Sequence, residues 1–232
     1  MIKDETSVRL RKTSWFLLIL ACLSVSSAVA AQAQHFSADI VAQHDAPAPA
    51  GRLSVLDGKV RIETTEVADG FFLVDTVKPS AYFVRPTART YMDARQSSRL
   101  TRLFVPVDLD APCQQWQAMA RLAGVAGEGE WRCERAGEET IDGHATVVFR
   151  VLSGAGEGYL GWIDRERRFP LQIKTDDGTL ITLKRIKHAP QQASSFELPA
   201  SYRKFNPEAL IEQIKQSDVW VSRPGAAEAS HP

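Results

Sequence analysis

The segment Arg52-Leu-Ser-Val-Leu-Asp-Gly-Lys-Val-Arg-Ile-Glu63 contains two runs of alternating apolar and polar residues on either side of Asp57-Gly58. Asp-Gly suits a type I′ turn, because both central residues of that turn have positive φ. The turn predicts a hairpin with one apolar face and one face of charged and polar side chains. The apolar residues that share a face in this register are Leu53, Val55, Val60 and Ile62.

Other short apolar runs follow along the chain and predict more strands. Pro79, Pro86 and Asp142-Gly143 are turn signals between them. Short strands separated by turn residues are typical of an antiparallel meander. The predicted strands outside the hairpin cover residues 71–75, 80–85, 89–93, 145–152, 158–164, 171–175, 180–187 and 196–199, and a further strand starts at residue 131.

Two or three helices interrupt the strands. Residues 97–103 predict one or two helical turns. A longer helix is expected from Asp110-Ala-Pro112 to Gly124, because proline fits a first helical turn and an acidic residue there favours the helix dipole. Residues 207–215 follow the capping Asn206 and predict a last helix. The longer helix has an apolar stripe that predicts core packing rather than a ligand site; it consists of Cys113, Trp116, Met119, Ala120 and Ala123.

These elements predict a mainly β (α+β) protein with a single domain over residues 31–222. No internal repeat and no linker divides that range. Residues 223–232 are rich in Gly, Ala, Ser and Pro and are expected to form a disordered tail.

Residues 1–30 are expected to be a secretory signal peptide. Basic residues precede the apolar run 15–23, which is long enough for a signal peptide and too short to span a bilayer. Ala28-Val29-Ala30 provides the small residues that signal peptidase recognises, so we expect a periplasmic protein. An alternative stays open, because Ile19-Leu20-Ala21-Cys22 resembles a lipobox in which an acylated Cys22 would anchor the protein as a lipoprotein.

The balance of charge argues against a nucleic-acid-binding protein, and the hydropathy argues against a transmembrane protein. The chain has 232 residues with 28 basic and 28 acidic side chains. A nucleic-acid-binding protein normally has a basic excess, so no nucleic-acid partner is expected. No run after residue 30 approaches the ~20 apolar residues of a transmembrane helix, so no transmembrane segment is expected.

Two cysteines, Cys113 and Cys133, lie beyond the predicted signal peptide. An even number of cysteines in an exported chain predicts a disulfide, because the periplasm keeps thiols oxidised. The alternative is a pair of buried free thiols. No histidine or other cysteine lies at zinc-ligand spacing beside either residue, so no metal site is expected.

The chain lacks the common catalytic motifs, and we expect no catalytic residues, no cofactor and no enzymatic activity. The five histidines that follow the signal peptide are scattered. Gly154-Ala-Gly156-Glu-Gly158 predicts a flexible turn, because no helix follows it to hold a phosphate. Asp164-Arg165-Glu166 is interpreted as a solvated charge cluster at a turn rather than an acid–base pair.

The order of several motifs resembles the bacterial periplasmic lipoprotein-carrier (LolA/LolB-like) superfamily. The resemblance covers most of residues 36–203 and includes Gly70-Phe-Phe-Leu-Val-Asp75, Ala81-Tyr-Phe-Val-Arg-Pro86, Gly161-Trp-Ile-Asp164 and Phe196-Glu-Leu-Pro-Ala-Ser-Tyr202. It implies a curved antiparallel half-barrel of about ten strands with two or three covering helices. The cysteine-bearing insert and the last helix are not part of the family pattern.

The resemblance also implies a function. An apolar concave face is expected to hold a lipid, an acyl chain or a segment of a lipoprotein. The residues expected to line that face are Leu53, Val55, Val60, Ile62, Phe71, Leu73, Tyr82 and Val84. The alternative is an envelope interaction or sensor module with a filled core, in which the helix over 112–124 and the last helix with Trp220 contact an envelope protein.

Overall fold

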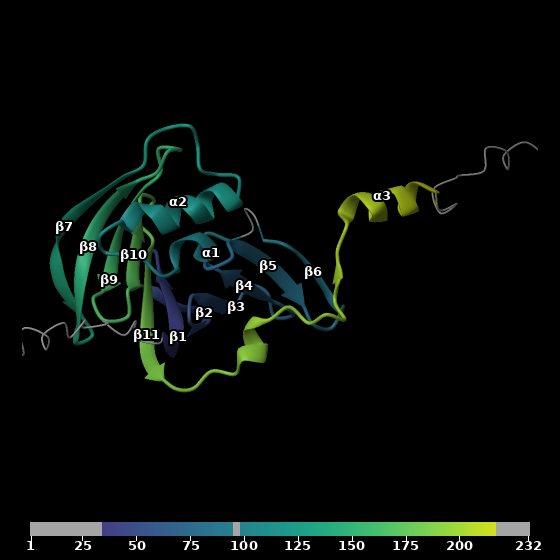
Figure 1. The fold of residues 1–232 in the computed structure, drawn as a ribbon, viewed down its shortest axis with the longest axis horizontal. Helices are drawn as coiled ribbons and strands as arrows, with labels where there is room; N and C mark the ends of the chain where they lie inside the picture. Colours follow the sequence, from purple (N-terminus) through teal and green to yellow (C-terminus); the bar gives the residue numbers. More distant parts are fainter. Residues whose placement is uncertain (1–33, 95–97, 217–232) are drawn as a thin grey trace, which may run out of the picture. The chain divides into compact units, whose positions relative to one another are not determined.

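We describe the fold from a computed structural model, in which residues 34–94 and 98–216 are described and belong to one compact unit (Figure 1). The predicted signal peptide, Trp220 and the predicted tail lie outside the described residues. Within the described ranges, twelve strands form one sheet. They are β1 (His35–Gln43), β2 (Pro47–Leu56), β3 (Lys59–Thr64), β4 (Phe71–Asp75), β5 (Ser80–Arg85), β6 (Thr90–Asp93), β7 (Arg132–Ile141), β8 (His144–Leu152), β9 (Gly158–Asp164), β10 (Phe169–Thr175), β11 (Leu180–His188) and β12 (Arg203–Lys204).

Three α-helices and one 3₁₀ helix complete the described chain. They are α1 (Leu100–Leu103), α2 (Pro112–Leu122), the 3₁₀ helix η1 (Ala193–Phe196) and α3 (Pro207–Gln216). Pro112 occupies the first turn of α2, as predicted. The side chain of Asn206 accepts a hydrogen bond from the Ala209 N–H at 3.1 Å, which confirms the predicted cap of α3.

The hairpin predicted from Asp57-Gly58 is confirmed. Asp57 and Gly58 have φ values of 44° and 82°, as a type I′ turn requires. β2 and β3 pair in the predicted register, with Leu53 opposite Ile62 and Val55 opposite Val60.

The sheet joins two meanders in the order β12-β6-β5-β4-β3-β2-β1-β11-β10-β9-β8-β7. β1 pairs with β11 and so connects the first meander, β1–β6, to the second, β7–β11. These pairs are antiparallel, and β12 adds to β6 in parallel. The mainly β fold and its large open sheet are therefore as predicted, with twelve strands where about ten were expected.

The predicted strand over residues 196–199 is wrong. Phe196 ends the 3₁₀ helix η1 and is buried, and Pro199 has no N–H to donate to a neighbouring strand. The chain joins the sheet only at β12, four residues after Pro199.

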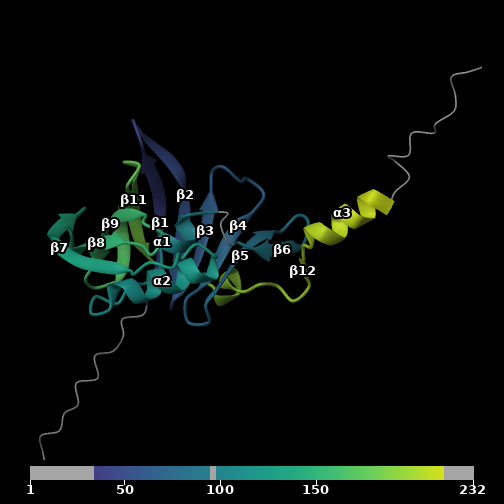
Figure 2. The same cartoon turned by 90° about the horizontal axis from the view of Figure 1, so that it is seen from above.

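The sheet curves around its helices. α2 contacts both β5 and β7, although eight strands lie between those two in the sheet. Nine strand spacings would span about 43 Å if the sheet were flat. A helix of 11 residues is only about 16 Å long. The sheet must therefore bend toward α2, and Figure 2 shows α1 and α2 lying across the same side of it.

The main hydrophobic core lies between the sheet and these helices, on what we call the helix side. Trp116 and Met119 from α2 pack there with Phe104 and Val105, which follow α1. The stripe predicted on α2 is confirmed at Trp116, Met119 and Ala120, which are buried. The Trp116 indole also donates a hydrogen bond to the Leu103 carbonyl at 3.1 Å, which links α2 to α1.

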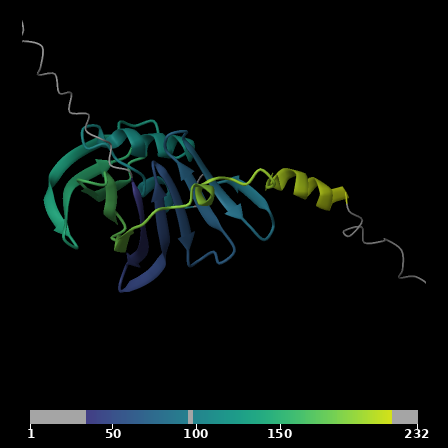
Figure 3. The ribbon, with the colours of Figure 1, turned by 60° about the horizontal axis from the view of Figure 1, so that its bottom comes forward.

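The segment after β11 crosses the opposite side of the sheet toward β12 (Figure 3). η1 contacts β3 on that side, where Arg61 donates a hydrogen bond to the Ser195 carbonyl at 3.2 Å. The Arg61 guanidinium also lies 3.4 Å from the centre of the Phe71 ring. The outer surface of the first meander is therefore partly covered by the chain itself.

Candidate functional site

The eight residues expected to line one apolar face lie on two different faces. β3 and β4 pair with Val60 opposite Val74 and Ile62 opposite Phe72, so Phe72 and Val74 are the residues of β4 that face the helices. The expectation that all eight share a face is therefore wrong. The four that lie on the opposite side are Phe71, Leu73, Tyr82 and Val84.

The error has a simple physical cause. Side chains alternate between the two faces of a strand, so a shift of one residue moves every side chain to the other face. Residues 71–74 are all apolar, and a continuous apolar run does not reveal which residues face the core. The loop between β3 and β4 decides the register, and no sequence pattern predicts it.

The other four residues, Leu53, Val55, Val60 and Ile62, lie on the helix side and are each 0% exposed. They belong to the core that contains Phe104, Val105 and Trp116. Side chains of the helices and of the loop after α1 therefore fill the part of the sheet where an open apolar face was expected. A role of the eight residues in ligand binding stays a prediction.

A cleft of about 440 Å³ lies on the other side of the sheet, over β7–β10, and we call it the open-face cleft. Leu152, which is 37% exposed, and Leu160 lie in it without a covering helix. The residues that line the cleft are Arg132, Glu134, Arg150, Val151, Leu152, Gly158, Tyr159, Leu160, Lys174, Thr175 and Asp176.

The strand register orders these side chains into rows across the sheet. Leu160 lies between Arg150 on β8 and Lys174 on β10. Leu152 lies opposite Gly158 in the next row. The two leucines thus lie on the inner strands β8 and β9. Arg150 lies beside Leu160, and the other charged side chains of the cleft lie on β7, on β10 or just after β10.

The cleft carries more positive than negative charge. Three basic residues line it, Arg132, Arg150 and Lys174, together with two acidic residues, Glu134 and Asp176. None of the three basic side chains forms an ion pair with any residue in the described part of the chain. Their charges are therefore available to a ligand.

The row of side chains next to Leu160, which contains Val148 and Trp162, is buried on the same side of the sheet as the cleft. Val148 and Trp162 lie opposite each other there and are buried, although the helices cover the other side of the sheet. The Trp162 indole donates a hydrogen bond to the Glu139 carboxylate of β7 at 3.0 Å. An ion pair of 2.9 Å between Lys184 of β11 and Asp142 of the β7–β8 turn spans the same side. The second meander therefore also curls toward this side.

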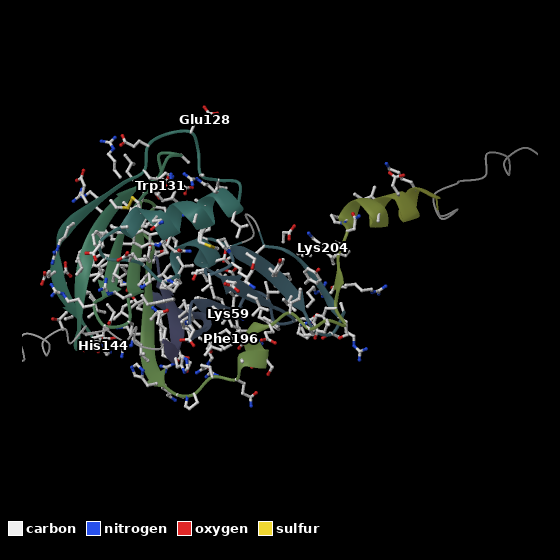
Figure 4. All side chains as sticks on the ribbon, viewed as in Figure 1. Lys59, Glu128, Trp131, His144, Phe196 and Lys204 are labelled. Atoms are coloured by element: carbon white, nitrogen blue, oxygen red, sulfur yellow. A yellow bond between two sulfur atoms is a disulfide. The ribbon has the colours of Figure 1, made fainter. Side chains whose placement is uncertain are left out.

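A small cavity of about 30 Å³ lies beneath α2 and shares four lining residues with the open-face cleft, namely Gly158, Tyr159, Thr175 and Asp176. Trp116 and Trp131 line this cavity, and Figure 4 shows Trp131 beside α2 at the end of the second meander opposite His144. A cavity of this size holds about one water molecule.

Aromatic and charged groups close this small cavity. The rings of Trp116 and Tyr159 meet edge to face with centres 5.3 Å apart. Burial raises the pKa of the Tyr159 hydroxyl well above its usual value. Arg102 lies 3.7 Å from Glu157, and its buried Nε has no hydrogen-bond partner among the described residues.

A second contact ties α1 to the strand ends beside the cleft. Asp177 accepts hydrogen bonds from the Thr175 hydroxyl at 2.6 Å and from the Thr179 N–H at 3.0 Å. Arg99, which precedes α1, lies 3.3 Å from the same carboxylate. These interactions hold the pKa of Asp177 far below its usual range. The hydrogen bond from Thr175 has the largest effect, and the hydrogen bonds from Thr179 and the positive charge of Arg99 add to it.

This lowered pKa predicts a dependence of stability on pH. The folded state favours the Asp177 carboxylate, so its stabilising effect is complete above the unfolded pKa of about 3.9 and is lost as the pH falls below it. We expect wild type to melt at a higher temperature than Asp177→Asn at pH 7, and this difference to shrink at pH 3. Thermal unfolding by circular dichroism measures both; an unchanged difference would contradict the role of the carboxylate.

The predicted disulfide is confirmed. The sulfur atoms of Cys113 and Cys133 lie 2.02 Å apart, and the bond joins the first turn of α2 to β7. It holds α2 against the edge of the sheet, on the side away from the open-face cleft.

The interpretation of Asp164-Arg165-Glu166 as a solvated cluster is wrong for Asp164. Its side chain is buried, accepts hydrogen bonds from the Glu166 and Arg167 N–H groups at 2.8 Å, and forms an ion pair of 2.7 Å with Arg167. Asp164 thus stabilises the β9–β10 turn. Arg167 also contacts His144 and His188, and no group of metal-ligating side chains occurs among the described residues.

No sequence motif identified the open-face cleft. Its residues come from four strands, and Arg150, Leu160 and Lys174 are neighbours only because of the register between those strands. The alternation of Arg150-Val-Leu152 shows that Arg150 and Leu152 share a face, but it does not show which face is uncovered. Within the described ranges, no helix is both long and apolar enough to cross a membrane.

No protein-family model and no curated protein matches the sequence. Similar solved structures include PNGF-II, with 7% identity and a TM-score of 0.49 over 79% of this chain and 34% of that chain. This chain thus spans about a third of PNGF-II. An uncharacterized conserved protein from Thermus thermophilus has 10% identity and a TM-score of 0.43, covering 75% of this chain and 91% of its own.

A putative outer membrane lipoprotein-sorting protein domain from Vibrio parahaemolyticus has 11% identity and a TM-score of 0.33, covering 72% of this chain and 91% of its own. These similarities are distant. Membership of the lipoprotein-carrier superfamily stays a prediction from the motifs.

Proposed function

We propose that this protein is an exported envelope protein that binds an apolar or amphiphilic molecule, such as a lipid or an acyl chain, in the open-face cleft. The observation that carries the proposal is the cleft of about 440 Å³, which Leu152 and Leu160 line without a covering helix. Its volume lies within the ~300–1,000 Å³ of small-molecule sites, which are concave and mostly apolar with a few polar groups. The disulfide supports export, because such bonds persist in oxidising compartments.

Leu160→Glu tests the proposal directly. Leu160 lies between Arg150 and Lys174, so the new carboxylate has cationic neighbours and the fold should tolerate it. The change removes apolar surface from the cleft, and burying a leucine side chain contributes about 1.5–3 kcal/mol. We expect a loss of at least tenfold in affinity for a neutral fluorescent acyl probe, measured by titration with the purified mature protein.

Val77→Glu is the matched control, because Val77 is 73% exposed in the β4–β5 turn, away from the cleft. It should bind the probe as wild type does. Equal losses in both variants, or no binding by the wild type, would contradict the proposal. Val55→Glu is unsuitable for this purpose, because Val55 lies in the core and a buried charge would unfold the protein.

An envelope protein partner is the second candidate. α2 cannot offer its apolar stripe to a partner, because Trp116, Met119 and Ala120 are buried against the sheet. The observation that favours a partner is Ile211 on α3, a large apolar side chain that is 50% exposed. We expect deletion of residues 206–232 to remove envelope proteins that co-purify with the full chain; an unchanged set would contradict this role.

A further inference from the structure

We infer that the ligand of the open-face cleft carries an anionic group, a carboxylate or a phosphate monoester on a single acyl-type chain, held between Arg150 and Lys174. This inference rests on the proposed function and names the chemical class of its ligand. It concerns the side of the sheet that faces away from α1 and α2.

The register brings the two cations to one point. Arg150 is directly opposite Leu160, and Leu160 is directly opposite Lys174, so all three side chains project from the same face. Two strand spacings separate the backbones of Arg150 and Lys174 by about 10 Å. Both side chains are long and flexible enough to meet over Leu160, so an anion there would have a cation on each side and an apolar surface beneath it.

Charge favours an anion at this point. Arg150 and Lys174 are exposed and form no ion pair in the described part of the chain. Arg132 of the same cleft is also without an ion pair among the described residues, whereas three arginines elsewhere in the second meander are paired: Arg135 and Arg165 with Glu138, and Arg167 with Asp164. A guanidinium binds a carboxylate or a phosphate through paired, charge-assisted hydrogen bonds.

The acidic residues of the cleft lie away from the point between the two cations. Glu134 is opposite Arg150 on the far side from Leu160, and it lies toward the edge of the sheet on β7. Asp176 follows the end of β10, beside the row that contains Leu152. An anion over Leu160 therefore has cations as its immediate neighbours in the row.

The adjacent row has room for the apolar chain. Gly158 lies opposite Leu152, and a Cβ added at Gly158 would come no closer than 3.9 Å to the Val151 carbonyl oxygen. The space over Gly158 is therefore open. A chain attached to an anion over Leu160 can lie across Gly158 and against Leu152.

The test compares ligands of one chain length and different head groups. Dodecanoate, dodecyl phosphate and dodecyltrimethylammonium, each below its micelle concentration, and dodecanol, below its solubility limit, are titrated calorimetrically into wild type and into Arg150→Gln/Lys174→Gln. We expect wild type to bind the two anions at least tenfold more tightly than dodecanol and the cation most weakly. The double variant should bind anions and dodecanol within threefold of each other.

Two further variants distinguish the effect of charge in the cleft from the effect of the open space over Gly158. Lys59→Gln/Lys78→Gln removes two charges outside the cleft and should leave the preference for anions unchanged. Valine suits a strand, and Gly158→Val fills the open space over Gly158. The variant should therefore lower the affinities for dodecanoate and dodecanol by the same factor. Inorganic phosphate and acetate are titrated alone, and we expect them to bind at least a hundredfold more weakly than the chain-bearing anions.

The outcomes distinguish this inference from the function on which it rests. Equal binding of dodecanol and dodecanoate by wild type would overturn the anionic head group and leave acyl binding intact. An unaltered preference for anions in the double variant would overturn the assignment to Arg150 and Lys174. Failure of all four ligands to bind would overturn the proposed function itself, and tight binding of free phosphate would show an anion site that needs no chain.

Discussion

Trp116→Ala is expected to lower the free energy of unfolding by about 3–5 kcal/mol, the usual cost of removing a large aromatic side chain from a core. Trp116 is 1% exposed, and its indole also supplies the hydrogen bond to the Leu103 carbonyl that joins α2 to α1. Its loss leaves a cavity, an unpaired carbonyl and a Tyr159 ring without its edge-to-face partner. The free energy of unfolding is obtained from the midpoint and slope of a urea unfolding curve, which is monitored by far-ultraviolet circular dichroism.

The control for this prediction is Val77→Ala. An exposed valine contributes little to stability, so the free energy of unfolding should change by no more than about 0.5 kcal/mol. Gly161 offers a second check. A Cβ at Gly161 would lie 3.1 Å from the Trp116 ring, so Gly161→Ala should destabilise wild type more than it destabilises Trp116→Ala. A loss below about 1 kcal/mol in Trp116→Ala would show that α2 does not hold the core together.

Removing the disulfide is the second large effect. Cys113 and Cys133 are separated by 20 positions, and closing a loop of that length stabilises the folded state by about 3 kcal/mol in the chain-entropy model. Cys113→Ala/Cys133→Ala should therefore unfold at a lower urea concentration than wild type by a corresponding amount. The reason is that the open chain gains conformational freedom when it unfolds.

A reducing agent provides the matching control for the disulfide. It should lower the unfolding midpoint of wild type toward that of the double variant and leave the double variant unchanged. A wild-type midpoint that does not respond to complete reduction would contradict a stabilising role for this bond.

The two sides of the sheet differ in what covers them, and this difference underlies the functional proposal. On the helix side, α1, α2 and the loop after α1 provide the side chains that bury Leu53 and Val60. Over β7–β10 on the other side, Leu152 and Leu160 have no such cover and share the surface with unpaired cations. The same fold thus has a packed core on one side and a cleft open to a ligand on the other.

A short stretch of sequence was sufficient to predict an element wherever residues close together in the chain control its structure. Asp57-Gly58 determines the β2–β3 hairpin and its register, because the turn chemistry acts over only four residues. Pro112 and the spacing of Trp116 and Met119 determine α2 and its buried side in the same way. The even pair of cysteines was enough to predict the disulfide, because an oxidising compartment, where the predicted signal peptide would direct the chain, joins two such thiols.

Tertiary structure alone decided which strand faces are covered and where the cleft lies. The face of Leu73 depends on the β3–β4 register, and the meeting of Arg150 with Lys174 depends on pairing through β9. The sequence by itself thus determined most of the strands, the positions of the helices, the mainly β class and the disulfide. The position of the binding surface came from the curvature and register of the whole sheet, because these arise from contacts between residues far apart in the chain, which no local pattern encodes.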